Sequence, residues 1–133
     1  MQPSITDRRV FPRFQLQPMY TPLAIAAVGD QSEGAFANEG HAYDISEGGV
    51  RFEAEQPIPP GSSVQMRITL PNLSTHDLES NRTILVTANV VWLEDEDQPG
   101  PYKMAATFHS FVRLADRDRL LRHFATGRYR AAA

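Results

Sequence analysis

The chain has 133 residues, of which 41% are hydrophobic and 22% are charged, and this suits a single globular domain with its own core. Its apolar runs are too short to cross a bilayer, and no basic segment leads into a long apolar stretch, so neither membrane insertion nor a secretory signal is expected. The absence of cysteine excludes disulfides and thiolate metal sites and favours a cytoplasmic protein, and the net charge is a modest −3.

The N-terminal segment is predicted to be an extended arm. Residues 1–17 show no sustained hydrophobic period, and their prolines discourage a helix. Three arginines, Arg8, Arg9 and Arg13, are concentrated in the stretch DRRVFPRF of this arm. The folded domain is expected over residues 18–133, so the chain is interpreted as one domain with an N-terminal extension.

Six strands are predicted in the body of the chain. The clearest covers residues 64–70, where apolar side chains alternate strictly with polar ones, as in a strand with one buried face. The same alternation over residues 82–94 predicts that Trp92 faces the core. Pro22 indicates an edge or a bulge in the first strand, because proline cannot donate a ladder hydrogen bond. The predicted strands are residues 19–28, 40–46, 50–55, 64–70, 82–94 and 102–109.

A helix is predicted after the last strand, because the hydrophobic period changes there. Asp116 is placed as its N-cap and Gly127 as its stop signal. Three apolar residues lie near one side of this helix, with Leu120 adjacent to them: Leu114, Leu121 and Phe124. Six short strands separated by turn signals and followed by one helix indicate an all-β fold, either a sandwich or a small barrel.

Two short motifs form the candidate site. Arg9 and Arg13 make R-x-x-x-R in the arm, and Asp44, Ser46 and Gly49 make D-x-S-x-x-G at the turn between the second and third predicted strands. Taken alone, the first motif is explained by a solvated arm and the second by an Asx-type turn before a glycine pair. Only their combination, in this order and in this predicted fold, favours a binding site.

The combination resembles the PilZ domain, the bacterial receptor domain for cyclic di-GMP, over nearly the whole chain. The stretch VVWLE…YKMAATF is similar to the fifth and sixth strands of that family, and DRDRLLRHF is similar to its C-terminal helix. The resemblance implies a six-stranded antiparallel β-barrel with a C-terminal α-helix and an extended N-terminal arm. One position departs from the family, because Ala105 stands where a glycine is frequent, and its methyl group is expected at most to weaken ligand binding.

The resemblance also implies a role for each motif residue. Guanidinium groups match the O6 and N7 acceptors of guanine and the phosphates, which would suit Arg9 and Arg13. Asp44 and Ser46 would accept hydrogen bonds from the N1 and N2 donors on the other edge of the base. Gly49 would supply either a positive φ or a close approach of the backbone to the ligand.

Arg8 bears on the number of ligand molecules. In similar PilZ domains, an arginine directly before R-x-x-x-R accompanies the binding of two intercalated ligand molecules. Arg8 would then hold the second molecule, and a solvated charge is the alternative explanation. The expected ligand is therefore cyclic di-GMP, with one or two molecules per chain.

The interpretation that follows is a cytoplasmic bacterial receptor or adaptor without catalytic activity. It rearranges its N-terminal arm on binding cyclic di-GMP and signals to a protein partner that the sequence does not identify. The sequence contains neither a serine-nucleophile motif nor a phosphate-binding loop, and its four histidines lack metal-ligand spacing, so neither catalysis nor a metal is expected.

Two alternative functions follow from the charge distribution and from the fold. Residues 1–13 and 113–133 are basic, whereas residues 14–112 carry four cations against thirteen anions. A small β-barrel could bind nucleic acid through such basic termini, although this is the less favoured interpretation. The other alternative is an adaptor that binds proteins and has lost the ligand, and the intact motif residues argue against it. Oligomeric state is left open.

Overall fold

The computed structural model of the protein describes residues 14–15, 21–28, 34–71, 82–94, 97, 99–125 and 130–131. Six long strands and one helix lie within these ranges, together with two strands of two residues each. In chain order the elements are β1 (Phe14–Gln15), β2 (Pro22–Ala27), β3 (Asn38–Ile45), β4 (Gly49–Ala54), β5 (Ser63–Thr69), β6 (Thr83–Leu93), β7 (Tyr102–Phe111), α2 (Leu114–Phe124) and β8 (Arg130–Ala131).

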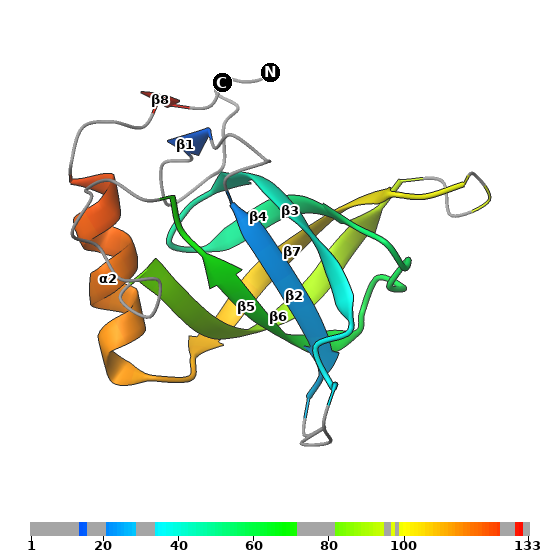
Figure 1. The fold of residues 1–133 in the computed structure, drawn as a ribbon, viewed down its shortest axis with the longest axis horizontal. Coiled ribbons are helices and arrows are strands. Elements are labelled where there is room, and N and C mark those ends of the chain that lie inside the picture. The colour runs from blue at the N-terminus through cyan, green and yellow to red at the C-terminus, as the bar shows by residue number, and fades with distance from the viewer. Residues whose placement is uncertain are drawn as a thin grey trace.

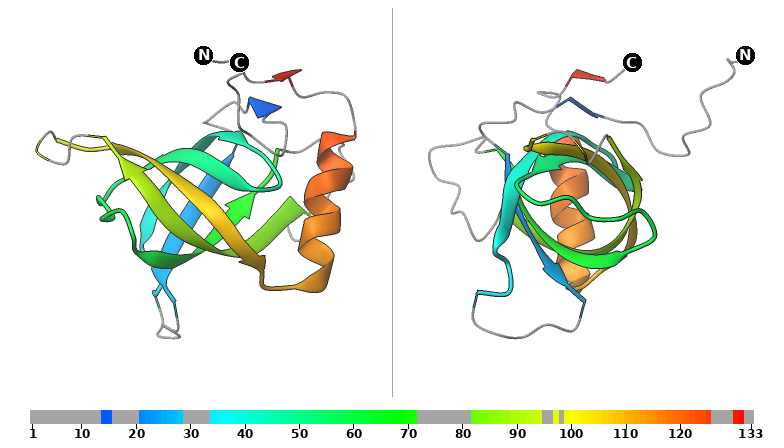
Figure 2. Two further views of the ribbon diagram at one scale, coloured as in Figure 1. Left: turned by 180° about the vertical axis from the view of Figure 1, so that it is seen from behind. Right: turned by 90° about the vertical axis from the view of Figure 1, so that its right-hand side faces the viewer.

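The six long strands form a closed antiparallel barrel (Figure 1). Their hydrogen-bonded order is β2-β5-β6-β7-β4-β3, and β3 pairs back with β2, so the sheet has no open edge between them. Helix α2 lies at one end of the barrel, and the β6–β7 hairpin projects from the opposite end, as the left view of Figure 2 also shows. The predicted six-stranded barrel with a C-terminal helix is confirmed, and the sandwich alternative is wrong. The domain division at residue 17 stays a prediction.

Closure of the barrel depends on close contact between β3 and its two neighbours. Gly40 pairs with Leu23 of β2 on one side and with Ala54 of β4 on the other. A Cβ atom at Gly40 would collide with the carbonyl oxygen of Glu53, so only glycine allows this approach. Pro22 is the first residue of β2, a position that tolerates proline, and the predicted edge is wrong because β2 pairs on both sides.

Alternating apolar side chains fill the barrel, and one irregularity changes which of them face inward. In β5 the predicted alternation is confirmed, since Val64, Met66 and Ile68 are buried. In β6 the register with β7 shifts between Val90 and Trp92, so one extra residue is inserted. Such a bulge moves the next side chain to the other face of the sheet. The prediction that Trp92 faces the core is therefore wrong, and its side chain is 49% exposed.

Helix α2 is attached to the barrel by a buried carboxylate. Asp116 is fully buried, and its Oδ2 accepts hydrogen bonds from the backbone amide of Leu85 in β6 (2.8 Å) and from Arg113 Nε (2.9 Å). Its Oδ1 accepts a third hydrogen bond, from Arg119 Nη1 (2.8 Å). The predicted N-cap role of Asp116 is wrong, because the helix begins at Leu114 and Asp116 instead joins its first turn to the sheet.

The apolar side of α2 is narrower than predicted. Leu120, which was placed beside this side, is fully buried, whereas Leu114 is 98% exposed at the start of the helix. The proposed stop at Gly127 lies outside the described residues, and the helix ends at Phe124. Within the described part of the chain, no helix combines the length and the apolar character that crossing a membrane requires.

The burial of Asp116 predicts a specific loss of stability. Asp116→Asn should lower the free energy of unfolding by about 2–4 kcal/mol, because an acceptor with three donors is replaced by an amide that turns a donor toward one of them. Urea unfolding without ligand measures this change. Asp118→Asn on the exposed face of the same helix is the matched control, and equal losses in the two variants would contradict the role of Asp116.

Candidate functional site

The turn that carries D-x-S-x-x-G is held closed by its own hydrogen bonds. The amide of Ser46 donates to the carbonyl of Gly49 (2.9 Å), and Ser46 Oγ accepts from the amide of Gly48 (3.0 Å). Asp44, near the end of β3, and Ser46, just after it, are both buried. Two polar side chains are therefore fixed side by side where β3 ends, which suits recognition of a polar ligand.

Gly49 serves the packing of the strands. Its φ lies outside the positive range, so the first of the two roles considered for this glycine, a left-handed conformation, is wrong. A Cβ atom at this position would lie 2.5 Å from the carbonyl oxygen of Ala106 in β7. On the same side, the amide of Phe108 donates to the carbonyl of Gly48 (2.9 Å). Gly49 thus allows a close backbone approach to β7, which fixes the turn on the barrel wall, while the second role, a close approach to the ligand, stays a prediction.

Asp44 has a charged partner that the sequence did not identify. Arg51 of β4 pairs with Asp44 across the two strands, and its Nε donates to Asp44 Oδ2 at 2.7 Å. The carboxylate is 5% exposed, whereas the arginine side chain is 53% exposed. The alternation of residues 50–55 does predict that Arg51 points outward. It does not reveal the partner, because an outward charge on a strand is usually explained by solvation.

The short strand β1 brings the end of the predicted arm to this turn. Phe14 pairs with Ile45, and Gln15 pairs with Asp44. Phe14 also stacks on Phe124 of α2, with ring centroids 4.2 Å apart. The residues of R-x-x-x-R and the arginine before it, which are Arg8, Arg9 and Arg13, lie outside the described residues. What the structure brings together is therefore the D-x-S-x-x-G turn and the two residues that directly follow Arg13 in the sequence.

A second contact joins the turn to α2. Glu47, which follows Ser46, accepts hydrogen bonds at Oε2 from Arg117 Nε (2.9 Å) and Nη2 (2.7 Å). Both nitrogens of one guanidinium fork therefore contact a single carboxylate oxygen, a charge-assisted arrangement with defined geometry. The helix therefore contacts the D-x-S-x-x-G turn through Glu47 and strand β1 through Phe14.

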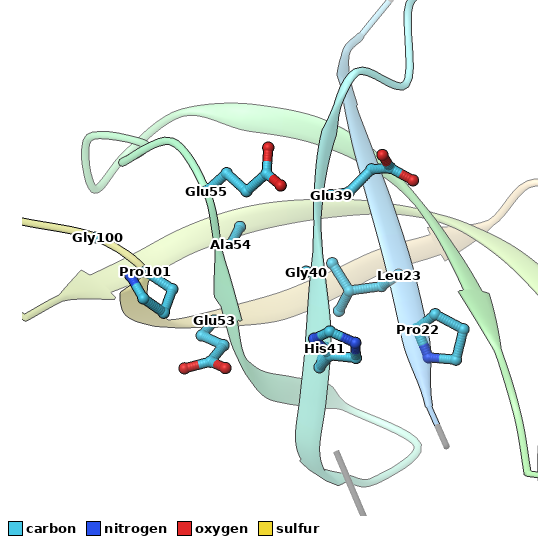
Figure 3. A pocket seen from close by; sticks show the side chains of 10 residues that line it. All are labelled: Pro22, Leu23, Glu39, Gly40, His41, Glu53, Ala54, Glu55, Gly100 and Pro101. Atoms are coloured by element: carbon cyan, nitrogen blue, oxygen red, sulfur yellow. The ribbon is translucent and has the colours of Figure 1, made fainter. Parts of the chain in front are cut away.

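The barrel also carries an acidic groove beside β3 and β4, and none of the residues of the D-x-S-x-x-G motif lines it. Figure 3 shows its lining, where Glu39 lies on β3, Glu55 directly follows β4, and Glu53 points to another side. The groove has a volume of about 680 Å³. The negative charges of these three carboxylates disfavour an anionic ligand, so the groove is a poor site for phosphates. Among the described residues, no group of three or more potential ligands is arranged to hold a metal ion.

Comparisons with known proteins identify the family and the fold. The sequence model of the PilZ domain matches residues 7–126. The structure of the Bacillus subtilis inhibitor of motility (MotI/DgrA) superposes with a TM-score of 0.63 at 20% identity, and covers 91% of this chain and 51% of that one. The MrkH–c-di-GMP complex of K. pneumonia gives 0.62 at 18% identity, with 90% and 51% covered.

The PilZ domain of Escherichia coli YcgR with c-di-GMP gives a TM-score of 0.58 at 16% identity, and covers 90% of this chain and 91% of that one. The present chain thus spans about half the length of the first two structures and nearly all of the third. No curated protein matches the sequence. At these identities the structural likeness establishes the fold, while the family rests on the sequence model.

The pKa of Tyr43 tests the electrostatics of the outer wall, because Tyr43 contacts Glu53, which lines the acidic groove. Burial raises the pKa of Tyr43 to about 12, and a hydrogen bond to Glu53 together with the charges of Glu53 and Glu94 adds to the effect. Glu53→Gln should therefore lower the pKa of Tyr43 toward its ordinary value, whereas Glu55→Gln should leave it in place. NMR titration of the tyrosine ring carbons measures both, and an unchanged pKa in Glu53→Gln would contradict the assigned contact.

Proposed function

The chain belongs to the PilZ domain family, and we propose on that premise that it is a receptor for cyclic di-GMP, which it binds between its two motifs. One observation carries the proposal. The two residues that follow Arg13 in the sequence form β1 and pair with Asp44 and Ile45 at the D-x-S-x-x-G turn. In this proposal, R-x-x-x-R, which directly precedes β1 in the sequence, acts together with the turn.

The chemistry of the turn supports a guanine ligand. Asp44 and Ser46 offer acceptors for the N1 and N2 donors of guanine, and they are buried enough for such hydrogen bonds to discriminate between bases. Arg51 donates to Oδ2 of Asp44, which leaves Oδ1 for the ligand. In this proposal Arg9 and Arg13 supply the donors for the O6 and N7 edge and for the phosphates.

Signalling would follow from the two contacts between the site and α2. The proposed ligand draws the arm over the turn, which changes the surroundings of Phe14 and Glu47, and these residues contact Phe124 and Arg117 of the helix. Ordering of the arm on binding costs free energy, so the net affinity is lower than the contacts alone would give. The rearranged arm and helix would then present a new surface to a protein partner in the bacterial cytoplasm.

Base selectivity is the first test of the site. Asp44→Ala should weaken binding of cyclic di-GMP more than binding of cyclic di-AMP, because adenine presents a different edge to an acceptor. Arg13→Ala should weaken the binding free energy of both cyclic dinucleotides by about 2–4 kcal/mol, because a charged hydrogen-bonding partner is lost. Isothermal titration measures these changes, with Asp118→Asn as the control, and equal losses for the two ligands in Asp44→Ala would contradict the role of Asp44.

The same titration separates the proposal from its alternatives. Saturable binding of cyclic di-GMP that GTP does not reproduce supports the receptor. Preference for long polyanions, with a steep dependence on salt and none on the cyclic dinucleotide, would indicate a nucleic-acid-binding barrel instead. No heat and unchanged amide shifts in NMR at high ligand concentration would indicate an adaptor without ligand.

Ligand number provides a separate prediction for Arg8. If Arg8 holds a second molecule of cyclic di-GMP, the unaltered chain binds two molecules and Arg8→Ala binds one, with its fold retained. The stoichiometry from isothermal titration decides this, and circular dichroism checks the fold. A ratio of two that survives the substitution would remove the role of Arg8 without affecting the proposal for the turn.

A further inference from the structure

The short strand β8, near the C-terminal end of the chain, lies beside β1. Arg130 pairs with Gln15, and Ala131 pairs with Phe14, in antiparallel register. Figure 1 shows the two short strands together, close to both ends of the chain. The hydrogen-bonded order β3-β1-β8 extends the sheet by two short strands past the D-x-S-x-x-G turn. The C-terminal segment therefore reaches the neighbourhood of the candidate site.

One row of paired residues leads from the turn to β8. Asp44 pairs with Gln15, and Gln15 pairs with Arg130. Residues that are directly opposite in antiparallel strands share one face of the sheet, so Arg130 is placed on the face of Asp44. The next row begins at Ile45, which is fully buried in the core. Two strand spacings, on the order of 10 Å, separate Asp44 from Arg130, and a ligand of two nucleotides can bridge such a separation.

Pairing of β1 with β8 brings two basic parts of the sequence together. Strand β1 directly follows DRRVFPR, which contains three arginines. Strand β8 belongs to residues 119–133, which contain four arginines and neither aspartate nor glutamate. Like charges repel when strand pairing brings them near each other. An anion bound at this place would relieve the repulsion.

The carboxylates of the turn already have arginine partners of their own. Asp44 Oδ2 accepts from Arg51 of β4, and Glu47 Oε2 accepts from two nitrogens of Arg117 in α2. Neither carboxylate therefore requires a further cation from β8. The positive charge that β8 adds to this end of the sheet is explained more directly by an anion that comes from outside the chain.

We propose that Arg130 is a further ligand-binding residue, which donates hydrogen bonds to a phosphate of cyclic di-GMP bound at the turn. The inference rests on the proposed function, and it adds the C-terminal strand to a site that the two sequence motifs place only in the arm and the turn. A guanidinium fork matches two phosphate oxygens, so arginine suits this contact better than lysine. A contact to phosphate adds affinity and fixes the orientation of the ligand without reading its bases.

Isothermal titration of the full chain with cyclic di-GMP tests this role. Arg130→Ala should weaken binding on the order of tenfold, because a charge-assisted hydrogen bond is lost. Arg130→Lys keeps the charge but loses the planar fork, so its affinity should lie between those of the unaltered chain and Arg130→Ala. Arg122→Ala is the matched control, because it removes the same charge from the exposed last turn of α2, outside the row of Asp44.

Hydrogen exchange at β8 gives a second and independent readout. A contact between the ligand and Arg130 stabilises the pairing of β8 with β1, because coupling between ligand and strand acts in both directions. Exchange of the backbone amides of residues 130 and 131 should therefore slow when cyclic di-GMP saturates the unaltered chain. The slowing should be smaller in Arg130→Ala than in Arg122→Ala, since only the first variant loses the contact.

Three results would overturn the inference while the proposed function stands. They are an affinity of Arg130→Ala within twofold of the unaltered chain, an equal loss of affinity in Arg122→Ala, and exchange at β8 that the ligand leaves unchanged. Circular dichroism checks that each variant keeps its fold. Absence of any cyclic di-GMP binding to the unaltered chain would instead overturn the proposed function itself.

Discussion

A single charge-assisted hydrogen bond, from Arg51 Nε to Asp44 Oδ2, sets the geometry of the candidate site. Asp44 is almost fully buried, and a carboxylate in that environment is stable only with a donor that compensates for lost hydration. Arg51 supplies this donor while more than half of its side chain stays exposed. The buried carboxylate therefore restricts the conformations of the exposed arginine side chain before any ligand binds.

Contacts of very different strength connect α2 to the rest of the molecule. The buried carboxylate of Asp116 is satisfied by three donors and holds the first turn of the helix firmly on β6. In the Glu47–Arg117 pair the side chains are 18% and 53% exposed, so solvent screens it more than it screens Asp116 and limits its contribution to about 1 kcal/mol. A ligand at the turn can therefore break the contact with Glu47 at small cost without detaching the helix. This difference lets the helix respond to the site while the barrel keeps its fold.

Local patterns in the sequence predicted the fold because most strands alternate without interruption, as β5 does. The motif residues Asp44, Ser46 and Gly49 were identified because they lie close together in one turn. Trp92 was misplaced because one inserted residue reverses the alternation, and nothing in a run of β-branched residues marks the insertion. Asp116 was misread as a cap because its decisive partner, the amide of Leu85, is distant in sequence. Errors thus arose where tertiary contacts override local preference.

Charge changes sign along the outer wall of the barrel, and Glu53 marks the boundary. It pairs in register with Lys103 on one side and with His41 on the other, and it belongs to the acidic groove. Arg51, two residues before it on β4, lines a smaller cavity together with Lys103. A dianionic ligand is attracted at one end of this short strand and repelled at the other, over distances comparable to the Debye length of about 8 Å in physiological salt. In the proposed complex, this charge distribution would orient the ligand with its phosphates away from the acidic groove.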